Sequence, residues 1–343
     1  MFSTLLDKLL KHHDLSSSEA AAAMEEIMAG RAAPAQIGGL LIGLAMKGER
    51  PDEIVGLART MRANAVRLVS TRGEVFDTCG TGGDQSHTFN VSSVVALVLA
   101  GCDVTVAKHG NRAVSSRCGS ADLFEALGVN VAAAPVQVER CLDAVGIGFF
   151  FAPTFHPSMR HAGPARKALG VRTAFNLLGP LTNPAGATRQ LVGVPRPEHT
   201  ELIARALALL GSERAWVVHG ADGLDEISTT GHTKVSECWR GGVNTFYVHP
   251  AEHGMPRAEM RALQGGDASE NAAIARSILS GATGPTRDVV VLNAAAALLV
   301  AERVRTLRDG IVLAAGVIDS GKASRKLDQM VEVSNRRMEA NPA

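Results

Sequence analysis

The chain has 343 residues, of which 46% are hydrophobic, so it can bury a sizeable core as one large domain or as a large and a small one. Its 35 basic and 34 acidic residues give a formal net charge of +1, which excludes a global positive field of the kind that attracts nucleic acid or an anionic membrane. Five scattered cysteines without a CxxC pair, no signal-peptide pattern and no apolar run of roughly 18 residues predict a cytoplasmic protein without disulfides or a membrane span.

Residues 1–72 predict a small all-helical domain. An apolar face over residues 2–10 and a capping box at Ser16 and Glu19 indicate the first two helices, and proline and glycine punctuate two more. No strand pattern occurs before Val75.

From residue 73 onward, short apolar runs alternate with helical stretches, which is the pattern of an α/β sheet. The candidate strands are EVFDTCG (74–80), CDVTVAKHG (102–110), IGFFFAP (147–153), RQLVGVP (189–195) and RAWVVHG (214–220). A late hairpin is predicted at 232–250, a return to the helical domain near 164–190, and mostly helix from Asp267. We therefore predict an α/β fold, in which a large α/β domain over 73–343, with a central mainly parallel sheet, joins the small helical domain.

The first candidate strand runs into the sequence DTCGTGGDQSHTFNVSS, residues 77–93. Its three glycines permit close backbone approach, and a helix expected to begin near Asn90 offers unpaired N–H groups and a positive dipole end. A phosphate or diphosphate fits such a loop, and a plain tight turn is the alternative. A dinucleotide fingerprint is excluded because Gln85 stands where that motif needs glycine.

The next candidate strand leads into KHGNRAVSSRCGSAD, residues 108–122. Lys108 and Arg112 supply positive charge, while an asparagine and three serines supply hydrogen bonds. Two loops that can each bind an anion, and that follow successive strands, can bind one polyanion between them. The alternative is a solvated basic loop followed by a helix cap at Ser120.

A later strand ends in the acidic sequence HGADGLDEIS, residues 219–228. Asp225 and Glu226 are adjacent hard oxygen ligands, which suits a Mg²⁺ ion that bridges carboxylates to substrate phosphates. A solvated acidic loop is the alternative, and a glycosidase pair is disfavoured because sequence neighbours rarely flank one scissile bond. The basic residues Arg160, Arg166 and Lys167 fit an exposed helix face, and no histidine stands in a Ser/His/Asp order or at metal-ligand spacing.

Taken together, these stretches resemble the anthranilate phosphoribosyltransferase family, whose members join anthranilate to phosphoribosyl diphosphate. The matching segments, in chain order, are GTGGD, TFNVSS, VAKHGNR with SS and GSADLFEALG, FNLLGPLTNPA, VVHGADGLDEIS, ENAAIARSILSG and LNAAAALLVA. The resemblance runs over nearly the whole chain. It implies transfer of the 5-phosphoribosyl group to the amine of anthranilate, the second step of tryptophan biosynthesis from chorismate. It also implies Mg²⁺ as cofactor and a homodimer formed through the helical part.

The resemblance also implies the residues of the site. Phosphoribosyl diphosphate binding is implied for Gly80, Gly83, Asp84, Thr88, Asn90, Val91, Ser92, Ser93, Lys108, His109, Gly110, Asn111, Arg112, Ala113, Val114, Ser115, Ser116 and Ser120. Anthranilate binding is implied for Gly80, Asn111 and Arg166, and metal binding for Ser92, Asp225 and Glu226. No residue is implied as a discrete catalytic acid or base.

The departures from the family pattern are mild. Gln85 replaces a common glycine, and Ala113, Arg117 and Cys118 replace residues that are usually small or basic. None of these changes removes a charged contact, so they affect only the flexibility of the glycine loop and the rim of the site.

Two rival functions stay open at this point. A pyrimidine nucleoside phosphorylase has a related fold with a glycine loop and a lysine after a strand, but its use of inorganic phosphate leaves Asp225 and Glu226 without a purpose. A noncatalytic relative that binds nucleic acid predicts a basic surface, whereas the charge of this chain is balanced.

Overall fold

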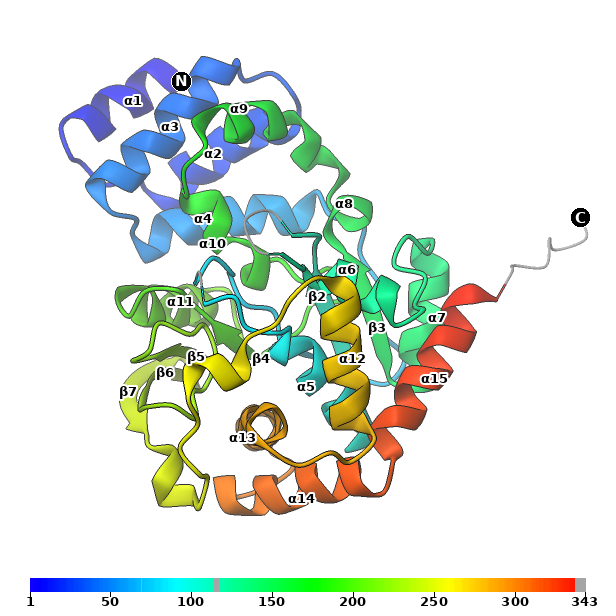
Figure 1. Cartoon of the computed structure of the whole chain (residues 1–343). Coiled ribbons are helices and arrows are strands. Elements are labelled where there is room, and N and C mark those ends of the chain that lie inside the picture. The colour runs from blue at the N-terminus through cyan, green and yellow to red at the C-terminus, as the bar shows by residue number, and fades with distance from the viewer. Residues whose placement is uncertain (69, 85, 114–116, 337–343) are drawn as a thin grey trace, which may run out of the picture.

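The computed structural model describes residues 1–68, 70–84, 86–113 and 117–336. Figure 1 shows a helical layer, blue in the picture, above a sheet that carries helices on its other side. The N-terminal helices of this layer are α1 (Phe2–Leu10), α2 (Ser17–Met28), α3 (Pro34–Lys47) and α4 (Pro51–Ala63). The predicted capping box begins α2, since the Glu19 N–H donates to Ser16 Oγ (3.2 Å) and the Ser16 N–H donates to the Glu19 carboxylate (2.9 Å).

The central sheet has seven strands within the described part of the chain, in the order β3-β2-β1-β4-β5-β6-β7. The strands are β1 (Phe76–Asp77), β2 (Val106–Gly110), β3 (Ile147–Phe151), β4 (Arg189–Gly193), β5 (Arg214–Gly220), β6 (Thr233–Trp239) and β7 (Gly242–Val248). The first five are parallel and the last two form an antiparallel hairpin, which confirms the mainly parallel sheet and the late hairpin. β1 is shorter than the predicted strand because the chain leaves the sheet after Asp77 and turns into the glycine loop.

One face of the sheet is covered by helices from the middle and the end of the chain (Figure 1). They are α5 (Val91–Gly101), α12 (Ala268–Leu279), α13 (Pro285–Val300), α14 (Leu307–Asp319) and α15 (Lys322–Asn335), with α6 (Ser120–Ala126) and α7 (Pro135–Val145) toward the β3 edge. α5 and α13 are apolar on nearly every side, and almost all of their residues are buried. Such helices are stable only inside a core, which places them at the centre of this layer.

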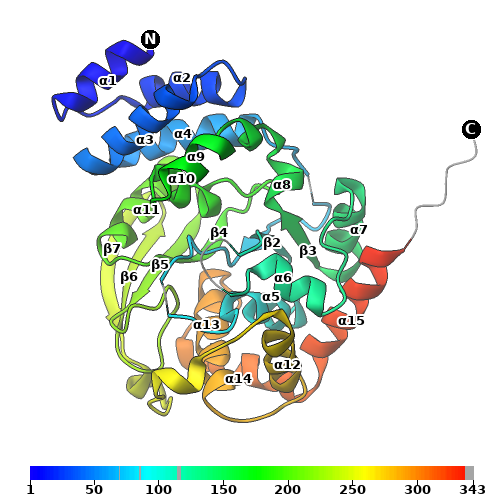
Figure 2. The same ribbon diagram turned by 45° about the horizontal axis from the view of Figure 1, so that its top comes forward.

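The opposite face of the sheet packs against α11 (Glu198–Leu209) and the helical layer. Figure 2 shows α9 (Gly163–Leu169) and α10 (Ala174–Leu177) between the N-terminal helices and the strands. Both helices contact α3, and one hydrophobic cluster includes Leu41 and Ile54 of the helical layer together with Val192 and Val217 of the sheet. The helical layer and the sheet therefore share a core.

Short helical turns complete the chain. They are α8 (Ala152–Phe155), and the 3₁₀ turns η1 (Pro157–His161), η2 (Gly179–Leu181), η3 (Pro250–His253) and η4 (Met260–Leu263). Within the described residues, no helix is both long and apolar enough to cross a lipid bilayer.

Candidate active site

A cavity of about 610 Å³ lies at the carboxyl ends of the parallel strands, between the sheet and the helical layer. β1 has β2 on one side and β4 on the other, so the cavity opens where the strand order reverses, the usual ligand position in open α/β sheets. Every described residue that was predicted to bind phosphoribosyl diphosphate, anthranilate or metal lines this one cavity. The predicted ligands Val114, Ser115 and Ser116, and the departure at Gln85, lie outside the described residues.

The glycine loop after β1 is shaped by close backbone contacts. Gly82 and Gly83 have φ values of 60° and 84°, which L-residues with side chains rarely adopt. The Thr81 N–H donates to Gly193 O at the end of β4 (2.9 Å), and Arg172 Nη2 donates to Thr81 O (3.2 Å). The Arg172 guanidinium also occupies the space that a Cβ at Gly83 would need. Arg172 was not predicted, because a single arginine in the sequence GVRTAFN carries no motif.

Gly83→Ala is expected to raise by about tenfold the KM for the substrate of the glycine loop, for which the sequence predicts phosphoribosyl diphosphate. The methyl group forces an unfavourable positive φ, costing roughly 1–2 kcal/mol, and displaces Arg172 from the loop. Gly186→Ala is the matched control, since Gly186 has a φ of 69° but nothing within 4 Å of its Cβ position. Steady-state kinetics of both variants measure the effect, and an equal change in KM for the two would show that the Arg172 contact is irrelevant.

The second half of the glycine loop leads into α5, which begins at Val91 with Asn90 as its N-cap, as predicted. The Ser92 N–H donates to Glu226 Oε1 (3.1 Å), so the first turn of α5 is tied to the acidic loop after β5. Ser93 Oγ lines the cavity as a buried hydroxyl without a hydrogen-bond partner among the described residues. A ligand oxygen would satisfy this hydroxyl.

Lys108 places a buried positive charge between the two predicted anion loops. Its ammonium group donates to Thr78 O (2.9 Å) and Ser92 Oγ (3.4 Å), at the junction of β2, the glycine loop and α5. Arg112 also lines the cavity, but its guanidinium is held on α6 by Asp122 (3.0 Å) and Glu125 (2.7 Å). Lys108 is therefore the better-placed cation for a bound anion.

Three carboxylates gather opposite Lys108. Burial raises the pKa of Asp225 to about 7, with Asp84 adding like charge and a shared hydrogen bond. Burial, and then the charge of Asp225, raise the pKa of Glu226 well above its ordinary value. Asn293 of α13 fixes the loop, because its Oδ1 accepts from the Ile227 N–H (2.9 Å) and its Nδ2 donates to Ile227 O (2.8 Å).

This cluster of three carboxylates is suited to bind a hard divalent cation. Asp84, Asp225 and Glu226, together with the Ser92 hydroxyl, offer only oxygen donors, the ligand type that Mg²⁺ prefers. The raised pKa values show that the positive charges of Lys108 and Arg172 do not compensate the buried carboxylates. A bound cation would supply the missing charge.

The same pKa shifts predict how metal-free stability depends on pH. A carboxyl group with a raised pKa contributes stability at low pH that is lost as the pH rises through its folded-state pKa, here about 7 for Asp225. Burial lowers the pKa of His109 to about 3 and that of His156 to about 4. These two shifts make stability rise with pH, but only below about pH 6.5, where the histidines of the unfolded chain are protonated. With a chelator present, the melting temperature should therefore fall between about pH 6.5 and pH 7.5, where Asp225 loses its proton in the folded state. A constant or rising melting temperature over that range would contradict the assigned shifts.

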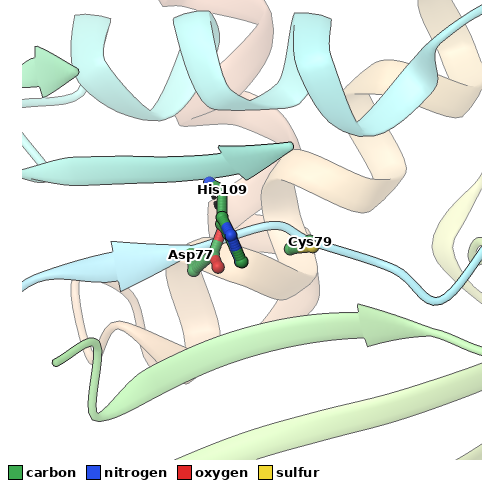
Figure 3. Close-up of side chains that lie close together, drawn as sticks. All are labelled: Asp77, Cys79 and His109. Atoms are coloured by element: carbon green, nitrogen blue, oxygen red, sulfur yellow. Dashed lines mark hydrogen bonds between the residues drawn. The ribbon is translucent and has the colours of Figure 1, made fainter. Parts of the chain in front are cut away.

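A second group of potential metal ligands lies at the wall of the cavity, where Asp77, Cys79 and His109 place one ligand atom each within 4.8 Å of one another (Figure 3). Asp77 already accepts from the His109 N–H (3.2 Å) and from Asn183 Nδ2 (2.8 Å). Burial raises the pKa of the Cys79 thiol to about 12, so it stays protonated. The adjacent Lys108 further disfavours a cation, and the group serves to anchor the ends of β1 and β2.

The wall of the cavity that faces the helical layer carries Arg166 of α9, Phe175 of α10 and Met61 of α4. The Arg166 guanidinium lies over the Phe175 ring, 5.8 Å from its centroid, and no described carboxylate forms an ion pair with it. Lys167 is exposed, as the sequence predicted for this helix, whereas Arg166 points its charge toward the cavity. A planar cation on an apolar wall suits an aromatic carboxylate.

The comparisons with known proteins place this chain in the glycosyl transferase family. Residues 3–65 match the "Glycosyl transferase family, helical bundle domain", and residues 72–324 match the "Glycosyl transferase family, a/b domain". An anthranilate phosphoribosyltransferase of Moorella thermoacetica is 54% identical over 331 residues, which are 96% of this chain and 98% of that protein. The chain belongs to the anthranilate phosphoribosyltransferase family.

Solved structures of this family superimpose over nearly the whole chain. The enzyme of Thermus thermophilus has a TM-score of 0.91 and 44% identity, covering 96% of this chain and 99% of that one. The enzyme of Saccharomyces cerevisiae in complex with phosphoribosyl diphosphate and Mg has a TM-score of 0.88 and 28% identity, with 97% of each chain covered. A further structure of the yeast enzyme contains 4-fluoroanthranilate, with a TM-score of 0.85, 26% identity, and 97% and 98% coverage.

Proposed function

We propose that this chain transfers the 5-phosphoribosyl group from phosphoribosyl diphosphate to the amine of anthranilate, giving N-(5-phosphoribosyl)anthranilate and diphosphate. The observation that carries the proposal is a single cavity that unites the glycine loop, Lys108 and the acidic pair, with Arg166 on the facing wall. The fluorescence of anthranilate should decay when the purified protein meets both substrates and Mg²⁺. Thymidine with inorganic phosphate serves as the control for a phosphorylase, and turnover of that pair alone would overturn the proposal.

Phosphoribosyl diphosphate lies in the half of the cavity between α5 and β2. The glycine loop from Gly80 to Asp84 and the first turn of α5 from Asn90 to Ser93 supply backbone and hydroxyl donors. Lys108 adds the positive charge, and the loop from His109 to Ser120 closes the other side. The buried, unpartnered hydroxyl of Ser93 supports a ligand at this position.

Mg²⁺ binds at Ser92, Asp225 and Glu226, with Asp84 adjacent. When bound, the ion supplies positive charge to the diphosphate and so stabilises its departure. The cluster of buried carboxylates with raised pKa values supports this position, because the residues present leave it short of positive charge.

Anthranilate occupies the half of the cavity that faces the helical layer. Arg166 offers two parallel donors to its carboxylate, while Asn111 and Gly80 lie on the side toward the ribose. Phe175 gives the aromatic ring an apolar neighbour. This arrangement directs the amine of anthranilate toward C1 of the ribose.

The residues of the site bind and orient the substrates rather than transfer protons. The amine of anthranilate is neutral at pH 7 and needs no strong base before it attacks, and the proton that the nitrogen loses when the C–N bond forms passes to water or to the departing diphosphate. His109 is also neutral, because burial lowers its pKa to about 3, and its Nδ1 is paired with Gly179 O (3.1 Å). Negative charge develops on the departing diphosphate, and Lys108 is a preorganised donor of the kind that contributes about 3–4 kcal/mol in other enzymes. Positioning by Arg166 supplies the remaining rate enhancement.

We further propose a cytoplasmic homodimer with the domain division at residue 72 and a return segment near 164–190. The contacts of α9 and α10 with α3 support the return segment, and five free cysteines suit a reducing compartment. Leu10 and Met46 of the helical layer are 81% and 76% exposed, and these apolar side chains support a dimer formed through that layer. Light scattering coupled to size exclusion tests the dimer, and a monomer mass at micromolar concentration would refute it.

A further inference from the structure

Asn271 of α12 is a buried side chain next to the cavity but outside its lining. Only 2% of the residue is exposed, and both ends of its amide are used. Its Oδ1 accepts from the Gly266 N–H (2.7 Å), and its Nδ2 donates to Oδ1 of Asn90 (3.0 Å). Asn90 in turn lines the cavity and caps α5.

The backbone N–H of Gly266 determines which groups donate and which accept in this series of hydrogen bonds. A backbone N–H can only donate, so the oxygen of Asn271 must face Gly266 and its amide nitrogen must face Asn90. The oxygen of Asn90 then accepts, and its Nδ2 donates to Cys118 O (3.1 Å). Flipping either amide would set two donors or two acceptors against each other, so Asn90 has one favourable orientation.

These hydrogen bonds connect the glycine loop after β1 with the loop that follows β2, the two loops predicted to bind an anion. Asn90 closes the glycine loop and Cys118 closes the loop after β2, and Asn271 holds both from α12. The backbone around Asn271 adds further ties, because Gly265 N–H donates to His87 O (2.8 Å) and Phe89 N–H donates to Leu263 O (3.3 Å). The segment before α12 therefore acts as a common support for both loops.

We propose that Asn271 is a positioning residue for phosphoribosyl diphosphate, acting through Asn90. The bond to Cys118 uses one of the two hydrogens of Asn90 Nδ2, and no hydrogen bond to a described residue uses the second, which a ligand in the cavity can accept. By fixing the Asn90 amide, Asn271 keeps this donor available before the substrate binds. The inference rests on the proposed function, because it assigns a residue that prepares the site for that substrate.

Asn271→Asp tests the proposal with almost no change of volume. The carboxylate still accepts from Gly266, but it sets an acceptor against the oxygen of Asn90 and forces that amide to turn. Without its oriented donor, the site should show a KM and a calorimetric Kd for phosphoribosyl diphosphate that are about three- to tenfold higher. The kcat and the KM for anthranilate should stay within about twofold, since uniform binding is lost for one substrate only. Asn335→Asp on α15 is the matched control, because its amide donates only to groups far from the cavity, such as Gly128 O and Val331 O.

A double-mutant cycle separates positioning from general support. If Asn271 acts through Asn90, then Asn90→Ala alone should weaken phosphoribosyl diphosphate binding as much as the pair Asn271→Asp with Asn90→Ala, within about twofold. The proposal would be overturned if the fold-losses of affinity of the two single variants multiplied in the double variant. It would also be overturned if the affinities for both substrates fell equally. If Asn271→Asp shows no cooperative melting transition, Asn271→Ser replaces it, since a serine hydroxyl does not reach Asn90 and makes the same prediction. The activity of the wild-type protein tests the proposed function separately, whatever the variants do.

Discussion

Replacing Asp225 by Asn and Glu226 by Gln in one variant is expected to abolish Mg²⁺-dependent turnover while making the metal-free protein more stable at pH 8. Turnover should fall by about a thousandfold or more, because the two anionic ligands that we propose for the metal are lost. Stability should rise because the folded state no longer has to bury two carboxylates beside Asp84, the burial that raises their pKa values in the wild type. Melting curves in a chelator should show a midpoint higher by roughly 2 °C or more.

The opposite signs of these two effects make the test sharp. Glu198→Gln with Glu201→Gln on α11 is the matched control, since it removes two acidic charges that are exposed and remote from the cavity. This control should leave turnover unchanged and move the midpoint little. A double site variant that keeps full Mg²⁺-dependent activity would remove Asp225 and Glu226 from the metal site.

Arg166→Ala should raise the KM for anthranilate by about 10- to 100-fold and change the KM for phosphoribosyl diphosphate by less than about twofold. The range follows from roughly 1.5–3 kcal/mol for a charge-assisted hydrogen bond to a carboxylate. No described carboxylate pairs with Arg166, so its removal exposes no buried partner charge. Steady-state kinetics with each substrate varied in turn measure the two constants.

Lys167→Ala provides the control for Arg166. Lys167 is the next residue on α9 and is exposed, so its loss removes the same formal charge without touching the cavity. Arg166→Lys is expected to recover only part of the affinity, because a single ammonium group cannot form two parallel bonds with a carboxylate. Equal losses for both substrates in Arg166→Ala would refute its assignment to anthranilate.

The sequence predicted the parts of the site that lie in continuous motifs. The glycine loop, Lys108 and the Asp225–Glu226 pair each follow a strand, and parallel strands bring their carboxyl ends to one edge, so local patterns sufficed to gather them. The resemblance to a family rested on the order and the spacing of these motifs along the chain. The sheet, the late hairpin and the start of α5 were predicted for the same reason, namely strong local periodicity and capping.

The sequence missed what depends on contacts between distant segments. Arg172 lies against Gly83, and Asn271 lies against Asn90, and neither pairing leaves a trace in local sequence. Arg112 was predicted to bind an anion, and in the structure its guanidinium forms ion pairs with Asp122 and Glu125. The number of charges in the loop does not predict these ion pairs. Arg166 was given an exposed face by its helical spacing and was assigned a role only through the resemblance.

The backbone hydrogen bonds that join His87 and Phe89 of the glycine loop to the segment 263–265 have a consequence for synthesis of the protein on the ribosome. The glycine loop leaves the exit tunnel early, whereas the segment that pairs with it is made only near the end of translation. At about 5–20 residues per second, the nascent chain spends roughly ten seconds or more with an unfinished loop. During this interval the glycine loop lacks the segment that pairs with it, so the complete site forms only after residues 263–265 have been made.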